Sequence, residues 1–308
     1  YYFPDSRYTE AAARHVRDAE IRQTDREHPY SALINEVTEK EHITRMGYED
    51  EYMTAADFRR FSEKLHCELV PATELLWTLR AVKDQAELDC MIQAQRIAEK
   101  ALADILGEIR PGVTEKEIAA LLLYKMLHYG AEDKSFDPIV VSGPNGSLPH
   151  GVPSEKPIQA GEFVTMDFGC KFGGYCSDMT RTVAVGNATA EMQVAYDLVL
   201  RAQLAGIQAL HAGVPCKEVY QAAYDVLAAE DKAQYFRHSL GHGVGLEIHE
   251  GYNASPRSED VYQTGNVTSV EPGIYLPDKF GIRIEDVLYL SPHGRENLSN
   301  VTKKLIVL

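Results

Sequence analysis

The chain has 308 residues, of which 44% are hydrophobic and 25% are charged, so it is long enough to bury a substantial core. No apolar run approaches the ~20 residues that span a bilayer, and the net charge of -15 disfavours nucleic acid and anionic membranes as partners. Five cysteines without a CxxC spacing argue against a disulfide framework and a thiolate zinc site, and favour a cytoplasmic protein.

The first part of the chain has the pattern of an α/β unit. Residues 9–19 and 49–65 have helical character, and an apolar pair follows at Leu69 and Val70. The sequence opens without an initiator methionine, so we expect that a front segment is missing from it. The character of the sequence changes near residue 79. We predict one domain over residues 1–78 and a second over residues 79–308.

In the second part, two helices followed by strands occur twice. Asp84 with Glu87, and Thr114 with Glu117, have the spacing of capping boxes and predict two helix starts. Extended segments are expected at residues 136–142, 162–168 and 174–185. The second set comprises helices at residues 189–211 and 217–229 and strands at residues 267–271 and 282–290.

A weak internal repeat supports this division. Residues 112–117 and 213–218 share glycine, valine, lysine and glutamate at the same places. Helices grouped apart from strands predict an α+β domain, with a largely antiparallel sheet backed by helices on one face. Two half-domains that face each other would enclose a central pit.

Four acids and one histidine interrupt apolar or glycine-rich strand segments, where an unpaired charge is expensive to bury. Each acid alone is more often a strand-end or salt-bridged residue, but two on consecutive strands favour a shared site. Gly241 and Gly243 remove side-chain bulk, so that the backbone there can approach a ligand. Carboxylates with one imidazole suit a pair of Mn, Co, Fe or Zn ions, which activate one water between them. The five residues are Asp167, Asp178, His242, Glu271 and Glu285.

Other polar residues are candidates for substrate contact. His150, His238 and His249 could hold substrate carbonyls or stabilise a tetrahedral intermediate, although each could also be a polar loop residue. Cys176 could be a thiol nucleophile, but its alternation with Asp178 favours strand packing. The chain has no GxSxG elbow, Walker loop or HExxH helix.

Five stretches of residues 80–308 carry a resemblance to a known family. They are SGPNGSLPHGVP, VTMDFGCKFGGYCSDMTRTV, HSLGHGVGLEIHE, VEPGIY and GIRIED. Together they resemble the pita-bread metallopeptidases, and within them the proline-specific branch of Xaa-Pro dipeptidases (prolidases) and aminopeptidase P. Residues 1–78 resemble only the latter part of that family's N-terminal domain. The resemblance implies a pita-bread catalytic domain preceded by a partial α/β domain, and a homodimer.

The resemblance also implies roles for the candidate residues. Asp178 and Glu285 would bridge two divalent ions, with Mn favoured over Co, Fe or Zn. Asp167 would complete the ligand set of one ion, and His242 with Glu271 that of the other. Glu271 would also take the proton of the attacking water and pass it to the proline nitrogen. His249 and His150 would hold the substrate carbonyl and its flanking groups, with His238 as a further substrate contact.

Dipeptidase and aminopeptidase remain alternatives. Arg257, fourteen residues before Glu271, resembles the position where prolidases keep an arginine for the substrate carboxylate, but a solvated loop arginine is an equal alternative. Arg283 is a weaker candidate, because its strand position beside Glu285 suits a structural pairing with the ligand carboxylates. Methionine aminopeptidase, a metal-free creatinase-like hydrolase and a non-catalytic binding module are less favoured.

Overall fold

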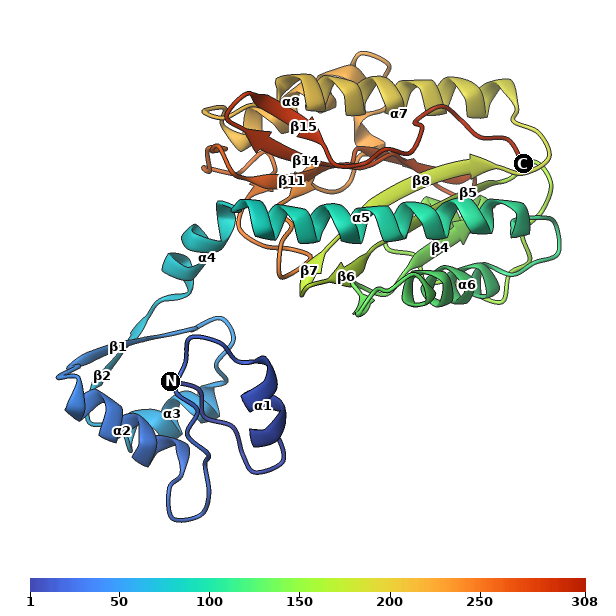
Figure 1. The fold of residues 1–308 in the computed structure, drawn as a ribbon. Coiled ribbons are helices and arrows are strands. Elements are labelled where there is room, and N and C mark those ends of the chain that lie inside the picture. Colours follow the sequence, from blue (N-terminus) through green and yellow to red (C-terminus); the bar gives the residue numbers. More distant parts are fainter. The chain divides into compact units, whose positions relative to one another are not determined.

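The computed structural model describes all 308 residues and divides them into two compact units, Tyr1–Trp77 and Thr78–Leu308 (Figure 1). None of its helices combines the length and the apolar character needed to cross a membrane. The boundary falls within helix α4 (Thr73–Ala81).

The N-terminal unit is a small α/β structure. Its two strands pair in parallel, with Arg45 opposite Glu68, and helix α3 lies between them in the chain. The predicted helix over residues 9–19 is shorter, because the chain becomes extended at Val16 and Asp18 has a positive φ of 56°. Helix α2 and strand β1 were not predicted. The elements before α4 are α1 (Thr9–His15), α2 (Tyr30–Lys40), β1 (Arg45–Tyr48), α3 (Ala55–Ser62) and β2 (Glu68–Pro71).

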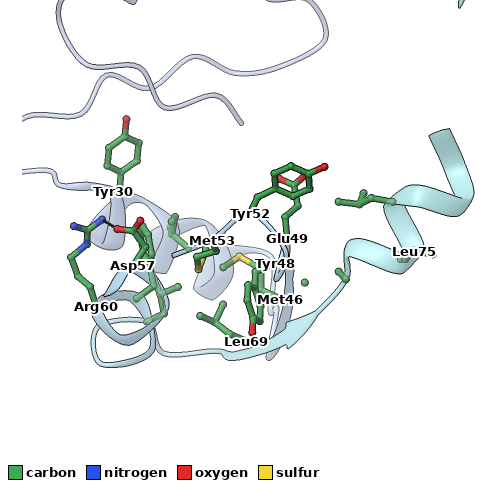
Figure 2. Close-up of a pocket in the computed structure, with 16 residues that line it drawn as sticks. Tyr30, Met46, Tyr48, Glu49, Tyr52, Met53, Asp57, Arg60, Leu69 and Leu75 are labelled. Atoms are coloured by element: carbon green, nitrogen blue, oxygen red, sulfur yellow. Dashed lines mark hydrogen bonds and ion pairs between the residues drawn. The ribbon is translucent and has the colours of Figure 1, made fainter. Parts of the chain in front are cut away.

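This unit contains an open pocket of about 780 Å³ (Figure 2). Its wall is mainly apolar, with Met46, Met53 and Leu69 among the lining side chains, and an ion pair between Asp57 and Arg60 is part of it. No histidine lines it. The pocket therefore lacks the mixed carboxylate and imidazole groups that the sequence predicts for the catalytic site.

Helices of the second unit, Thr78–Leu308, begin at the predicted positions. The side chain of Asp84 accepts from the backbone N–H of Glu87 and the side chain of Glu87 accepts from that of Asp84, and Thr114 and Glu117 form the same reciprocal pair. Both capping boxes are confirmed. The helices are α5 (Gln85–Ile105), η1 (Leu106–Glu108), α6 (Glu115–His128), η2 (Gly143–Ser147), α7 (Ala190–Ala209), α8 (Cys216–Ala228) and η3 (Ala233–Tyr235).

The longer strands of this unit form antiparallel sheets, ordered β4-β5-β8, β11-β14-β15 and β12-β13. They are β4 (Ile139–Ser142), β5 (Phe163–Phe168), β8 (Met179–Ala184), β11 (Val267–Val270), β12 (Gly273–Leu276), β13 (Phe280–Arg283), β14 (Asp286–Ser291) and β15 (Gly294–Asn297). Shorter antiparallel pairings involve β3 (Asp133–Lys134), β6 (Cys170–Phe172), β7 (Tyr175–Cys176), β9 (Gly241–His242) and β10 (Asn253–Ala254).

Each half of the unit packs two helices onto its own strands. Side chains of α5 and α6 share one core with β5 and β8, and those of α7 and α8 share another with β13 and β14. In Figure 1 the strands accordingly lie between the α5–α6 pair and the α7–α8 pair. The predicted α+β class is confirmed.

The internal repeat is visible in the backbone hydrogen bonds. Gly112 donates to the carbonyl of Ile158 at 2.9 Å, and Gly213 donates in the same way to Tyr262 at 2.7 Å. Both glycines have positive φ, 94° and 88°, where an L side chain is disfavoured. The weak sequence repeat therefore corresponds to one local structure used before α6 and again before α8.

Candidate active site

Two strands of the first half bring two acids together. Asp167 lies on β5 opposite Thr180 of β8, and Asp178 directly precedes β8. Because β5 and β8 are antiparallel, the end of one meets the start of the other. Asp178 is buried, and both carboxylates line one cavity of about 370 Å³.

The second half adds three ligand-type side chains to the same place. His242 lies on β9, Glu271 follows β11, and Glu285 separates β13 from β14. Ligand atoms of Asp178, His242 and Glu285 all lie within 4.8 Å of one another. The Nε2 atom of His242 is 3.2 Å from Glu271 Oε1 and 3.5 Å from Asp178 Oδ2. The five proposed ligands therefore converge from both half-domains.

Three oxygens of this cluster have no hydrogen-bond partner. They are Asp167 Oδ1, Asp178 Oδ1 and Glu285 Oε1, and all three are buried. Buried polar atoms are normally paired, and an ionised oxygen without a partner is especially unfavourable. Divalent cations would satisfy these atoms, since carboxylate oxygens and one imidazole are an ordinary ligand set for such ions. The residues present thus fit a metal centre.

Burial and the crowding of negative charge raise the pKa of three carboxyl groups of the cluster. Burial raises the pKa of Asp167, although the charge of Arg283 opposes this. Burial, and then the nearby Glu285 and Asp167 carboxylates, raise the pKa of Asp178 well above its usual range. Burial, and then the Glu271 and Asp167 carboxylates, do the same to the pKa of Glu285. Without a cation the cluster therefore favours protonated carboxyl groups.

Glu271 behaves differently from its neighbours. Burial raises its pKa, but the hydrogen bond and charge of His242, with further charges from His238 and Arg283, outweigh burial and lower the pKa to about 2. Ser269 Oγ also donates to Glu271 Oε1 at 3.2 Å. Glu271 is therefore an ionised carboxylate at neutral pH, which can ligate a cation or accept a proton.

Two hydroxyl groups that orient the carboxylates were not predicted. Thr180 Oγ1 donates to Glu285 Oε2 at 2.7 Å, and Ser269 donates to Glu271 as described above. Each hydroxyl lies two residues from a proposed ligand on the same segment, since Thr180 follows Asp178 and Ser269 precedes Glu271. Side chains two apart share one face of a strand, so the spacing of Ser269 and Glu271 was a signal in the sequence. The partner of Thr180 is 105 residues away, and no local signal pointed to it.

Arg283 is paired within the site. Its Nη2 atom donates to Asp167 Oδ2 at 2.6 Å and its Nη1 atom to the hydroxyl of Tyr275 at 2.6 Å, while the side chain is only 4% exposed. These contacts agree with the structural pairing that the sequence suggested as the alternative to substrate binding. Arg283 offsets part of the negative charge of the cluster but leaves the three unpaired oxygens described above.

His238 is linked to Arg283 through Tyr275, another residue that the sequence did not identify. The hydroxyl of Tyr275 lies 2.9 Å from His238 Nε2, and His238 Nδ1 lies 2.7 Å from the carbonyl of Ser239. A carbonyl only accepts, so the ring carries its proton on Nδ1 and accepts from Tyr275 at Nε2. Burial lowers the pKa of His238 to about 4. The ring is neutral at physiological pH.

Of the remaining residues predicted to contact substrate, His150 and His249 line the cavity and Arg257 does not. His150 and His249 line the cavity together with His238, and the ring of His249 packs edge-on against His242 with 4.1 Å between centroids. Phe136, Ile139 and Ile248 add apolar wall. Arg257 is exposed and is not among the residues that line the cavity.

The glycines beside His242 lie against neighbouring backbone, a requirement that the sequence did not reveal. A Cβ on Gly241 would lie 1.9 Å from the carbonyl oxygen of Ser269, and one on Gly243 would lie 1.9 Å from that of Glu250. Distances below 3.0 Å are not tolerated at backbone atoms. These glycines let the His242 segment approach neighbouring backbone, which places the imidazole.

Cys176 is not a nucleophile of this site. Its side chain is buried in a hydrophobic cluster with Leu88, Met91 and Val244, and burial raises the pKa of its thiol. A thiol with a raised pKa holds less of the reactive thiolate at neutral pH. The packing interpretation of Cys176 agrees with this environment.

Comparison with known proteins identifies the family. Residues 89–292 match "Metallopeptidase family M24", and residues 1–82 match "Creatinase/Prolidase N-terminal domain". The chain belongs to metallopeptidase family M24. As a member of this family it is a hydrolase that uses divalent metal ions and acts on peptides.

Several members are similar over most of the chain. The Xaa-Pro dipeptidase of Pyrococcus horikoshii is 36% identical over 84% of this chain and 72% of that protein. A solved Xaa-Pro dipeptidase from Bacillus anthracis has a TM-score of 0.94 at 38% identity, with 99% of this chain and 86% of that one covered. A solved X-Pro aminopeptidase from Thermotoga maritima has a TM-score of 0.93 at 36% identity, with 99% and 87% covered.

Metal binding should release protons from the M24 hydrolase. Burial and the neighbouring carboxylates raise the pKa of Asp178 and of Glu285 in the metal-free cluster, so the pair keeps protons to a higher pH than free carboxyl groups do, and ligation requires their loss. Titration calorimetry of Mn²⁺ into metal-stripped protein should give a binding heat that changes with the ionisation enthalpy of the buffer, because the protein releases protons as it binds the ion. The metal affinity should fall as the pH is lowered.

A matched control is Glu191→Gln, which removes an exposed acid paired with Lys279 and should leave the proton count unchanged. A binding heat that is the same in all buffers would contradict the raised pKa values.

Proposed function

We propose that this chain is a two-metal Xaa-Pro dipeptidase, which hydrolyses the bond between an N-terminal residue and a following proline. The observation that carries the proposal is one small cavity lined by four ligand-type side chains, in a chain similar to proteins named Xaa-Pro dipeptidase. The ligand atoms of the fifth residue, Glu285, lie within 4.8 Å of those of Asp178 and His242. A cavity of about 370 Å³ is near the lower end of the ~300–1,000 Å³ usual for small-ligand sites. That size suits a short peptide.

The metal centre would use residues from both half-domains. Asp178 and Glu285 would bridge the two ions, Asp167 would hold one of them, and His242 with Glu271 would hold the other. Mn is the ion we favour, with Co, Fe or Zn as alternatives, because oxygen-rich sets with one nitrogen suit all of these. When bound, such ions polarise a carbonyl and make a water molecule more acidic.

The protein's own residues would bind the substrate and move protons. Glu271, ionised and held by Ser269, would accept the proton of the attacking water and deliver it to the departing proline nitrogen. His249 and His150 would hold the substrate carbonyl and its flanking groups. His238, neutral and oriented by Tyr275, offers the substrate a ring that carries no charge. Proline is a distinctive leaving group because its amide has no N–H.

The main alternative is an aminopeptidase that cleaves longer peptides, because the Thermotoga maritima relative is named X-Pro aminopeptidase. Methionine aminopeptidase is disfavoured by the match of residues 1–82 to the creatinase/prolidase N-terminal domain. A metal-free hydrolase or a binding module does not need the set of ligand side chains that is present here.

We also infer that the chain forms a homodimer and that its functional domains cover residues 1–78 and 79–308. A cytoplasmic location stays a prediction.

Replacing a proposed bridging ligand tests the function most simply. Asp178→Ala should abolish hydrolysis of Ala-Pro and reduce the bound metal, because the variant loses a carboxylate shared by both ions. Activity on Ala-Pro, with Ala-Ala as the control substrate, should be measured beside metal analysis. Wild-type turnover by the variant after chelation and readdition of Mn²⁺ would show that the site assignment is wrong.

Arg257 tests the choice between dipeptidase and aminopeptidase. If Arg257 receives the free carboxylate of a dipeptide, Arg257→Ala should raise KM for Ala-Pro far more than KM for Ala-Pro-Ala, whose carboxylate lies further along. Steady-state kinetics on both peptides gives the comparison, with Arg237→Ala as an arginine control from another loop. Equal effects on both peptides, or faster wild-type cleavage of the tripeptide, would favour the aminopeptidase.

A further inference from the structure

A buried ion cluster lies directly behind His249. Glu250, the next residue, has a side chain only 2% exposed, and its Oε1 atom is 2.6 Å from Nζ of Lys83, which is equally buried. Its Oε2 atom is 2.6 Å from Nη2 of Arg80. None of these three residues lines the cavity. Removing these charges from water costs free energy, so we looked for a role of the cluster in the placement of the adjacent His249.

The carboxylate of Glu250 also closes the turn that carries His249. Its Oε2 atom accepts from the backbone N–H of Glu247 at 3.2 Å, and its own N–H donates to the carbonyl of Gly243 at 3.0 Å. A Cβ on Gly245 would lie 2.0 Å from Glu250 Oε1. The turn between β9 and β10 is thus built closely around this one side chain.

The segment that carries Arg80 and Lys83 is hydrogen-bonded to a different part of the catalytic unit. The N–H of Lys83 donates to the carbonyl of Gly265 at 2.9 Å, and Nδ2 of Asn266 donates to the carbonyl of Ala81 at 2.9 Å. Gly265 and Asn266 lie just before β11, the strand that leads to Glu271. The ion cluster therefore ties the turn of His249 to the backbone that also carries a proposed metal ligand.

The geometry points to Glu250 as a positioning residue: paired with Lys83 and Arg80, it fixes the turn of residues 243–252 and thereby the place of the His249 imidazole in the cavity. This inference rests on the substrate-contact role proposed for His249. No hydrogen bond to the ring of His249 is present, and the ring is held by packing on His242 at 4.1 Å between centroids. Its location therefore depends on the backbone turn.

A double-mutant cycle separates positioning from general stability. Wild type, Glu250→Gln, His249→Ala and the double variant are compared by kcat, KM and bound metal, using whichever peptide the wild type cleaves best. Glu250→Gln should lower kcat roughly 10-fold or more, with bound metal retained, because small misplacements of a contacting group slow turnover steeply. In the His249→Ala background, which should itself keep its metal, the same change should lower kcat less than about twofold.

Glu162→Gln is the control, since Glu162 forms a carboxylate–lysine pair with Lys156 at 2.7 Å elsewhere in the unit and should keep wild-type kcat. If Glu250→Gln does not fold, Lys83→Met replaces it in the same cycle, with the same criteria. An equal loss of kcat in both backgrounds, or no loss in either, would overturn the positioning role. Failure to cleave any Xaa-Pro peptide would instead overturn the proposed substrate, and the cycle would still report on Glu250.

Discussion

Burial of several carboxylates in one small cavity is the constraint on which the rest of the catalytic unit depends. Asp167, Asp178, Glu271 and Glu285 lie close enough that burial and mutual repulsion raise the pKa of three of them. Arg283 and His242 neutralise part of this charge, but three buried oxygens keep no partner. Without cations the cluster favours protonated carboxyl groups, and metal binding would replace these protons and satisfy the unpaired oxygens.

The architecture explains how distant segments supply this cluster. Antiparallel strands place Asp167 beside Asp178 in one half, and the second half, which repeats the first in its local hydrogen bonds, contributes the others. Glycines at 241 and 243 permit the backbone contacts that hold His242. Hydroxyl groups two residues from the ligands then fix the carboxylate oxygens. The proposed ligands thus lie on strands or directly beside them, whereas the histidines proposed to contact substrate lie on turns and loops.

Sequence reasoning succeeded where a local pattern carries the information. The capping boxes at Asp84 and Thr114 and the α+β order of elements follow from short-range signals, and the family motifs located the converging acids. It missed Tyr275 and the ion cluster of Glu250, because the residues that they contact are distant in the chain. Glu250 and Lys83, for example, are 167 positions apart. It also missed the backbone contacts of Gly241 and Gly243, since sequence alone does not show which backbone passes beside them.

The most direct measurement follows bound metal and Ala-Pro hydrolysis together as Mn²⁺ is added back to metal-stripped protein. The account predicts that the stripped protein is inactive, and that turnover reaches its maximum when two ions are bound per chain. It also predicts that Ala-Ala is cleaved far more slowly under the same conditions. Turnover that persists without metal, or a protein that binds two ions and leaves Ala-Pro intact, would contradict it.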